Sequence, residues 1–337
     1  MRVDHCRITN MEFDEEDQIR TPMRTLWEEN YPFDYWQNRI FKINPYNPQD
    51  KMEALFTLLQ LSDTYATILA AKLRNPYAPW YVVKEELPTR EIHQTLQELQ
   101  ATEGDRTYIE LMKLEEEPAA LVNFEIKEEW AESLTTFDLL AADLLGCPAK
   151  IDEEGKDIEF VDPPEKYVAA CNAVVNFWKD HTQLLNDLKH GFRLLPFDRD
   201  TFEDMIKMGL LRSSDESVDI EAKLDEYQRT KDEYLYFWRL EVDELVDPDE
   251  FDTTEDVEIG MRLVVYRTDA TQCKELADIT LRLLHNLFGR GGENRAVDSI
   301  QSLIGEGNES VTILDDFLRG ELVYATGRPE GVEDLDG

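Results

Sequence analysis

The chain has 337 residues, of which 73 are acidic and 35 are basic, and its formal net charge is -38 at pH 7. A hydrophobic fraction of 42% is enough for a packed core, which excludes a chain that is disordered throughout. No stretch of about 18 apolar residues is present, and the N-terminal residues turn acidic where a signal peptide would be apolar. We therefore expect a cytoplasmic protein that does not associate with a membrane.

The acidic residues are spread along the chain rather than confined to one segment, and only 15 of the 35 basic residues are lysines. This composition resembles that of haloarchaeal cytoplasmic proteins, whose acidic surfaces suit a cell filled with salt. At molar salt the Debye length falls to about 3 Å, which screens the repulsion among carboxylates. The alternative is an acidic low-salt protein that mimics nucleic acid or binds a basic partner. Such a protein would gather its acids on one face.

The four cysteines do not suggest a metal site or a redox motif. Cys6, Cys147, Cys171 and Cys273 form no CxxC pair, and their spacing does not match that of zinc ligands. The sequence also lacks the HExxH and GxSxG patterns of metalloproteases and serine hydrolases. We expect free thiols, no bound metal and no cofactor.

The first half of the chain predicts an arm followed by helices. Residues 1–48 are rich in aromatic residues and proline, and we expect an arm with short helices that packs on the main body. Apolar residues then recur with a helical period over residues 49–74, and Pro76 ends that helix. A polar helix is expected at 89–102 and an apolar one at 133–146.

The second half predicts one long helix and a pair of strands. Pro164 fits the first turn of a helix that runs to about residue 195. Residues 234–242 and 259–265 have a period of two and a high content of residues that favour strands, which predicts two antiparallel strands joined by an acidic loop at 243–257. Three further helices are expected at 270–288, 294–303 and 311–318.

These elements predict a mainly α fold, a helical bundle with a small antiparallel β unit at about residues 232–267. The β unit is too small to be stable alone, so we expect it to be part of the bundle domain. The expected domains are the arm at 1–48, the bundle with its β insertion at 49–325, and a disordered acidic tail at 326–337.

One side of the predicted helix 164–195 carries a stripe of polar side chains. With about 100° of rotation per residue, the stripe consists of Lys179, Gln183, Asn186, His190 and Arg193. Asn186 and His190 are four residues apart, so their side chains can touch. An amide, an imidazole and a guanidinium on one face could bind a phosphate, with the histidine as acid or base near neutral pH. The alternative is a solvated helix face without chemistry.

His181 falls on the opposite, apolar side of the same helix. A buried imidazole requires a hydrogen-bond partner, so a core histidine bonded to a neighbouring helix is the plain interpretation. A catalytic or ligand-binding role is the alternative. Metal binding is not favoured, because no second ligand lies three or four residues away.

The segment Asn186-Asp187-Leu188-Lys189-His190-Gly191 resembles the Asn-x-x-x-His of HEPN-type helical bundles, a family rich in RNA-cleaving toxins and defence proteins. In that family an Arg usually precedes the Asn, but Leu185 occupies the matching position here. The resemblance implies RNA cleavage by an Arg and a His around the phosphate, typically across a dimer interface. Asn186 and His190 carry over, and Arg193 is a candidate substitute for the missing Arg.

Three functions follow from these observations. The first is a HEPN-like protein that binds RNA or a nucleotide, or acts as a regulatory or defence-associated partner, through Lys179, Gln183, Asn186 and Lys189. The second is a metal-independent endoribonuclease that uses His190 with Arg193 as catalytic residues. The third is a structural or interaction protein without a catalytic site. The resemblance and the aromatic strand at 234–238 together suggest a homodimer.

Overall fold

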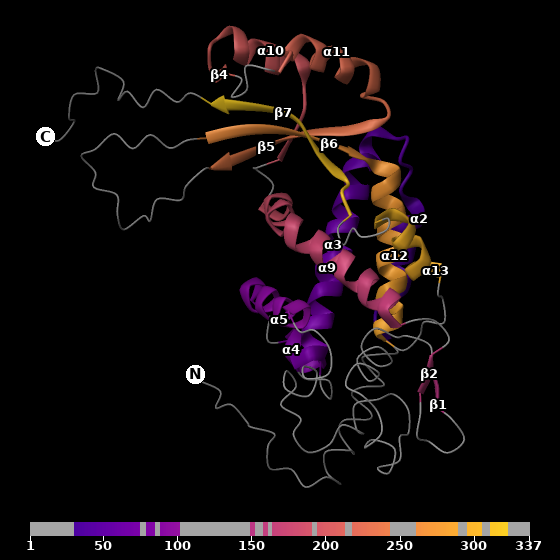
Figure 1. Ribbon diagram of the computed structural model, residues 1–337. Helices are drawn as coiled ribbons and strands as arrows, with labels where there is room; N and C mark the ends of the chain where they lie inside the picture. The colour runs from indigo at the N-terminus through magenta and orange to yellow at the C-terminus, as the bar shows by residue number, and fades with distance from the viewer. Residues whose placement is uncertain are drawn as a thin grey trace, which may run out of the picture. The chain divides into compact units, whose positions relative to one another are not determined.

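The computed structural model confirms a mainly helical chain with a small antiparallel sheet (Figure 1). It describes residues 30–74, 79–84, 88–101, 149–151, 158–160, 164–190, 194–212, 218–242, 261–288, 295–304 and 311–322. Several predicted segments lie outside the described residues: the first 29 residues of the arm, the helix at 133–146, the acidic loop between the two strands, and the tail at 326–337.

The described helices are α2 (Phe33–Lys42), α3 (Pro48–Arg74), α4 (Pro79–Lys84), α5 (Thr89–Ala101), α9 (Pro164–His190), α10 (Arg199–Lys207), α11 (Ile220–Thr230), α12 (Ala270–Leu287) and α13 (Arg295–Ile304). The described strands are β1 (Ala149–Ile151), β2 (Ile158–Phe160), β3 (Leu194–Pro196), β4 (Leu211–Arg212), β5 (Tyr234–Val242), β6 (Met261–Asp269) and β7 (Leu314–Leu322).

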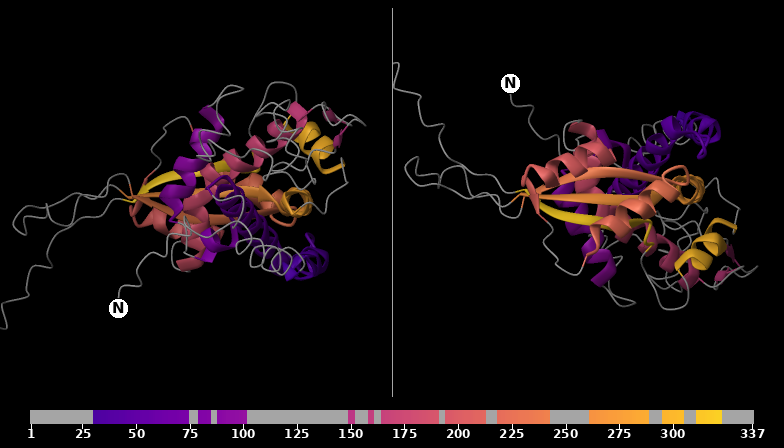
Figure 2. Two further views of the ribbon diagram at one scale, coloured as in Figure 1. Left: turned by 90° about the horizontal axis from the view of Figure 1, so that it is seen from below. Right: turned by 90° about the horizontal axis from the view of Figure 1, so that it is seen from above.

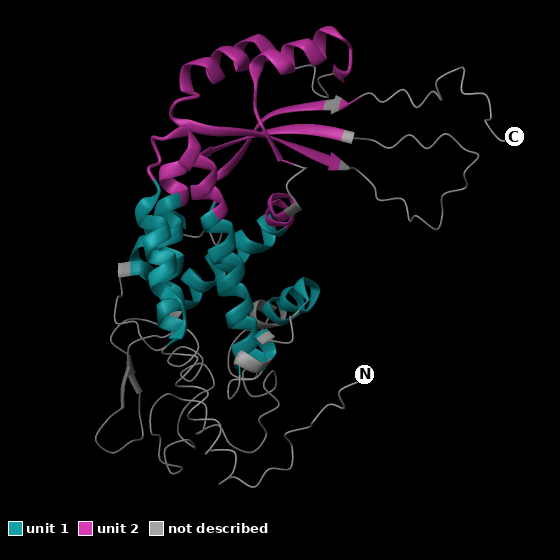
Figure 3. Cartoon of the chain, turned by 180° about the vertical axis from the view of Figure 1, so that it is seen from behind, with its two compact units in different colours: residues 1–43, 57–182, 274–311 teal, residues 44–56, 183–273, 312–337 magenta. Residues whose placement is uncertain are grey.

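The chain divides into two compact units, coloured separately in Figure 3. The first unit comprises residues 1–43, 57–182 and 274–311, and the second comprises residues 44–56, 183–273 and 312–337. The long helices α3 and α9 each contribute residues to both units.

The first unit has an apolar core built from its helices. Fully buried side chains come from α3, α9 and α12, and include Leu58, Leu69, Phe177, Trp178 and Leu284. α3 is long and apolar enough to cross a membrane by length and composition, but 72% of its most apolar window is buried inside the protein. Such burial is what the central helix of a globular core shows. Among the described residues, no other helix passes the same test.

The second unit is built on a five-stranded antiparallel sheet with the order β3-β5-β6-β7-β4. β5 and β6 pair along their whole length, from Tyr234 opposite Asp269 to Val242 opposite Met261. The predicted pair of strands is therefore confirmed. One face of the sheet carries Tyr236 and Trp238, which form a core with side chains of α10 and α11. Figures 1 and 2 show these two helices covering that face.

The prediction of a helix at residues 311–318 is wrong, because β7 forms there instead. β7 pairs with β6, and the register shifts between Val265 and Tyr266. The irregularity inserts an extra residue, so that the consecutive residues Phe317 and Leu318 are both buried in the core. A bulge of this kind disrupts the alternation of apolar and polar residues by which a strand is recognised in a sequence.

The predicted end of the long helix at residue 195 is also wrong. α9 ends at His190, and Leu194–Pro196 forms β3 at the edge of the sheet. In β3 the residues Leu194, Leu195 and Pro196 lie opposite Arg239, Trp238 and Phe237 of β5. Pro196 lies at an edge strand, where the lack of a backbone N–H costs least. Pairing with β5 thus decides the conformation of this segment.

Gly320 allows the short edge strand β4 to pack against β7. A Cβ at this position would lie 2.9 Å from Cγ of Leu211, closer than atoms of that kind approach one another. Leu211 is itself buried in the core of the second unit. The glycine in the middle of β7 is therefore required by close packing.

Candidate functional site

The structure places four of the predicted binding residues along α9. Gln183 and Lys189 are exposed, whereas Lys179 and Asn186 are half-buried. For His190 the structure describes only its place as the last residue of α9. Arg193 lies outside the described residues. The proposed catalytic pair of His190 and Arg193 therefore stays a prediction.

His181 lies one helical turn after Phe177, and the two rings meet edge to face with their centroids 4.6 Å apart. The imidazole is half-buried rather than enclosed. This contact agrees with its expected place on the apolar side of the helix. Among the described residues, no three His, Cys, Asp or Glu side chains are grouped so that they could hold a metal ion.

Asp187 is the residue of this helix that sequence reasoning missed. Although it is acidic, it is only 1% exposed. Its Oδ2 accepts a hydrogen bond of 2.8 Å from Nε of Arg239 on β5, and its Oδ1 accepts one of 3.2 Å from Nε2 of Gln183. A buried carboxylate requires such partners, because desolvation of an unpaired charge is costly. This ion pair joins the last turns of α9 to the sheet.

The network continues across the same face of the sheet. Nη1 of Arg239 lies 3.4 Å from Oε1 of Glu241, and the hydroxyl of Tyr266 donates to the same carboxylate at 2.6 Å. Burial disfavours the charged form of Arg239 and is the largest single effect, but the hydrogen bonds and charge interactions with Asp187 and Tyr266 together outweigh it and raise the pKa of Arg239. Burial and the hydrogen bond to Glu241 raise the pKa of Tyr266 to about 12. The phenol therefore stays protonated and acts as a donor at neutral pH.

One signal in the sequence could have revealed this network. Arg239 and Glu241 continue the row of alternate residues that begins with Leu235 and Phe237, and the latter is fully buried. A charged side chain in a buried row requires a partner of opposite charge from elsewhere in the fold. The sequence does not identify that partner, which lies 52 residues earlier in the chain.

A second group of polar side chains lies within the first unit, where α3, α5 and α9 meet. Nε1 of Trp178 donates a hydrogen bond of 2.9 Å to Oδ1 of Asp63. The imidazole of His93 lies over the indole of Trp178, with ring centroids 4.4 Å apart and ring planes inclined by 32°. Burial and the positive charge of Lys179 lower the pKa of His93. The imidazole is therefore neutral at neutral pH.

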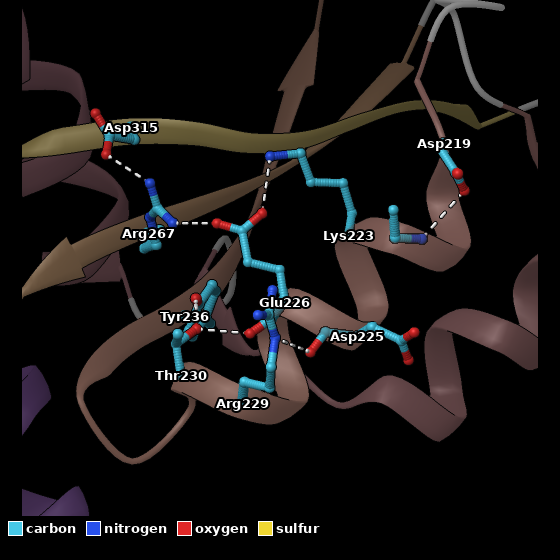
Figure 4. A network of polar contacts seen from close by, with 10 residues as sticks. Asp219, Lys223, Asp225, Glu226, Arg229, Thr230, Tyr236, Arg267 and Asp315 are labelled. Atoms are coloured by element: carbon cyan, nitrogen blue, oxygen red, sulfur yellow. Dashed lines mark hydrogen bonds and ion pairs between the residues drawn. The ribbon is translucent and has the colours of Figure 1, made fainter.

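A third network fastens α11 to the other face of the sheet (Figure 4). The carboxylate of Glu226 accepts hydrogen bonds from Lys223 at 3.1 Å and from Nη1 of Arg267 at 2.6 Å. Nη2 of Arg267 also donates to Asp315 on β7 at 3.2 Å. Since the guanidinium lies 5.7 Å from the ring centre of Phe317, it also has a cation–π contact there. Glu226 thus links its own helix to β6, and Arg267 links β6 to β7.

Replacement of Glu226 with Gln is expected to remove part of the acid sensitivity of the protein. Burial tends to raise the pKa of Glu226, but its pairing with Lys223 and Arg267 outweighs burial and lowers the pKa below the usual 4.5. A carboxyl with a lowered folded-state pKa contributes stability above pH 4.5, and this contribution is lost as the pH falls through the folded pKa. We expect the stability of Glu226→Gln to fall less steeply below pH 4.5, as measured by urea unfolding.

The exposed Glu221 on the same helix provides the matched control for this experiment. Glu221→Gln should leave the slope of stability against pH close to that of the wild type. Equal slopes for Glu226→Gln and the wild type would show that the network does not contribute in this way.

The aromatic residues 234–238 do not provide the exposed apolar surface that a homodimer through this strand requires. Tyr236, Phe237 and Trp238 are 6%, 0% and 5% exposed, respectively. Tyr236 and Trp238 pack into the core under α10 and α11. These aromatic side chains therefore contribute to the core of a single chain.

No family model, curated protein or solved structure matches this chain.

Proposed function

We propose that the protein is a HEPN-like cytoplasmic protein that binds RNA or a nucleotide through the polar stripe of α9 and has a regulatory or defence-associated role. The observation that supports binding is the inward orientation of Asp187. This acid lies next to Asn186 in sequence, yet it is buried and paired with Arg239. Its negative charge is therefore offset by the guanidinium of Arg239, although its Oδ1 still accepts a hydrogen bond from the stripe residue Gln183.

The remaining acid in this part of the helix is Asp180, which is exposed. With about 100° of rotation per residue, it lies roughly 120° around the helix from Asn186. The outer side of α9 thus carries amide and lysine side chains in a chain whose net charge is -38. A phosphate group is attracted to such a surface and repelled by most of the other surfaces of an acidic protein.

Binding of a short single-stranded oligoribonucleotide tests this proposal, with affinity measured by fluorescence anisotropy over a range of KCl concentrations. Lys189→Glu should weaken binding roughly tenfold and should also reduce its dependence on salt, as expected for the loss of a phosphate contact. Lys207→Glu is the matched control, because Lys207 is exposed on α10, away from the stripe. It should bind as the wild type does.

The other outcomes of this experiment separate the alternatives. RNA cleavage that His190→Ala and Arg193→Ala each abolish would identify an endoribonuclease instead of a binding protein. Binding that is the same for the wild type, Lys189→Glu and Lys207→Glu would exclude the stripe as the site. No binding at any salt concentration would favour a structural or interaction protein. Sedimentation of the wild type would test the homodimer that the family resemblance implies.

We also propose that the acidity is an adaptation to high salt. Exposed acidic residues occur on elements of both units: Asp34, Asp180, Asp200, Asp204, Glu221, Asp225, Asp232, Glu233, Glu275, Asp298, Asp315 and Asp316. A protein that mimics nucleic acid would gather such residues on one face. Spreading over many elements instead supports a surface that requires screening by salt.

A further inference from the structure

The outer side of α2 exposes two aromatic rings to solvent. Phe41 is 83% exposed and Tyr35 is 57% exposed. Among the side chains that the structure describes, those of no other helix include an exposed aromatic residue. Large apolar groups that stay in contact with water on a folded surface commonly mark a place where another molecule binds.

α2 is held firmly on the first unit by its inner side (Figure 1). Phe33 stacks on the imidazole of His285 of α12, with ring centroids 3.8 Å apart, and Ile40 is only 5% exposed. Nη1 of Arg39 donates a hydrogen bond to the side chain of Gln60 on α3. The exposed rings therefore belong to a fixed helix, and their positions are set before any ligand arrives.

The two rings flank a polar centre on this helix. Tyr35 and Phe41 are each three residues from Asn38, and Lys42 is four residues after it, so all three side chains lie next to Asn38 on the helix surface. Asn38 and Lys42 are exposed, and neither forms a hydrogen bond or ion pair with a residue that the structure describes. The exposed Asp34 lies one turn before Asn38, on the side away from Lys42. We call Tyr35, Asn38, Phe41 and Lys42 the α2 face.

The composition and size of the α2 face favour one kind of ligand. The exposed side chains of α2 are aromatic, amide or charged, and none is aliphatic, unlike the apolar face of a helix that docks in a groove. The helix is about 15 Å long, which is too short for the roughly 800 Å² that each partner buries in a stable protein interface. Rings beside an ammonium suit the bases and phosphates of a single-stranded nucleic acid. α2 also has one acid and two basic residues, in a chain of net charge -38.

We propose that the α2 face binds single-stranded nucleic acid, with bases stacked on Tyr35 and Phe41 and a phosphate at Lys42. Asn38 lies between the rings and offers an amide to the edge of a base. Stacking does not release counterions, so it persists at salt concentrations that weaken phosphate contacts. RNA and DNA share these bases and phosphates. The α2 face has no residue in common with the polar stripe of α9, so it is a site beyond the proposed function.

Binding of a short oligouridylate to the full chain tests this proposal, with affinity measured by fluorescence anisotropy at a fixed KCl concentration. Phe41→Ala should weaken binding about tenfold, because one stacked base is lost. An abasic strand of the same length and charge should bind the wild type and Phe41→Ala equally. Phe41→Trp keeps a ring and should bind at least as tightly as the wild type, whereas Phe41→Leu should be as weak as Phe41→Ala.

Two more variants serve as controls. Leu303→Ala removes an apolar side chain that is 45% exposed on α13, and it should leave binding unchanged. Lys42→Gln should weaken the binding of both strands and reduce its dependence on salt, as expected for the loss of a phosphate contact. Because Phe41 is exposed, its variants should melt at the temperature of the wild type. Wild-type affinity of Phe41→Leu would show that no base stacks there and would overturn the proposal.

A second arm uses oligothymidylate in place of oligouridylate. Equal affinities that both fall in Phe41→Ala would support a site for either sugar, and tighter binding of oligouridylate that falls in the same way would support a site that contacts the 2′-hydroxyl. Binding that depends on Lys189 but is unchanged in Phe41→Ala and Tyr35→Ala would overturn this proposal and leave the proposed function in place. Binding that depends on Phe41 but not on Lys189 would do the reverse. No binding of either strand would overturn both.

Discussion

Replacement of Arg239 with Met is expected to lower the free energy of unfolding by about 3–5 kcal/mol, the range for breaking a buried ion pair. The variant leaves the carboxylate of Asp187 only 1% exposed and without its guanidinium partner. The desolvation cost of that charge is then uncompensated. Urea is the suitable denaturant, because guanidinium chloride would itself change the ionic strength around a chain of net charge -38. All variants are compared at one KCl concentration.

Two further variants make this experiment specific. Arg319→Met removes an arginine that is 49% exposed on β7 and pairs with Asp316 three residues away, so it should cost less than about 1 kcal/mol. The double variant Arg239→Met with Asp187→Leu removes both buried charges and should recover most of the loss. If the double variant were as unstable as Arg239→Met with no recovery, the loss would come from packing of the arginine stem rather than from the unpaired Asp187.

Replacement of Lys51 with Met is expected to destabilise the protein by about 1.5–3 kcal/mol, the range for hydrogen bonds to a charged group. The side chain is 3% exposed, and its ammonium donates to the carbonyl oxygens of Lys231, Asp232 and Tyr234 at 3.2, 2.5 and 3.2 Å. These carbonyls lie where the chain turns from α11 into β5. The lysine thus holds the second unit's part of α3 to that turn through contacts about 180 residues apart in sequence.

The contribution of Lys51 to stability is expected to change with pH, and Lys51→Met should remove that change. Burial lowers the pKa of Lys51 from 10.5, and the nearby acids Asp232, Asp269 and Glu233 offset part of this effect. Because the folded pKa lies below the unfolded one, the unfolded chain binds more protons between the two values, and stability attributable to Lys51 rises with pH there. That rise should be absent from Lys51→Met. The exposed Lys207 gives the control Lys207→Met, and an equal loss in both variants would contradict the role of Lys51.

The sequence by itself predicts those elements whose stability depends on one apolar face. The helices α3 and α12 and the middle of α9 lie where a helical period places apolar residues, and most of these residues are buried, in α9 for example Val174, Phe177 and Leu184. β5 and β6 follow from apolar residues at every second position and from a high content of aromatic and β-branched residues. The acidic composition follows directly from the sequence, and so does the row of polar residues on α9.

Only the tertiary structure decided how segments distant in sequence pair. β7 was predicted as a helix, because its bulge hides the alternation, and only its register against β6 makes it a strand. α9 ends at His190 because the next residues pair with β5. The candidate site also depends on tertiary contacts. The stripe residues all lie on one helix and could be chosen from the sequence. The burial of Asp187 depends on Arg239, and the position of His93 depends on Trp178. Local periodicity is encoded in consecutive residues, whereas partners 52 or 85 residues apart meet only when the core has formed.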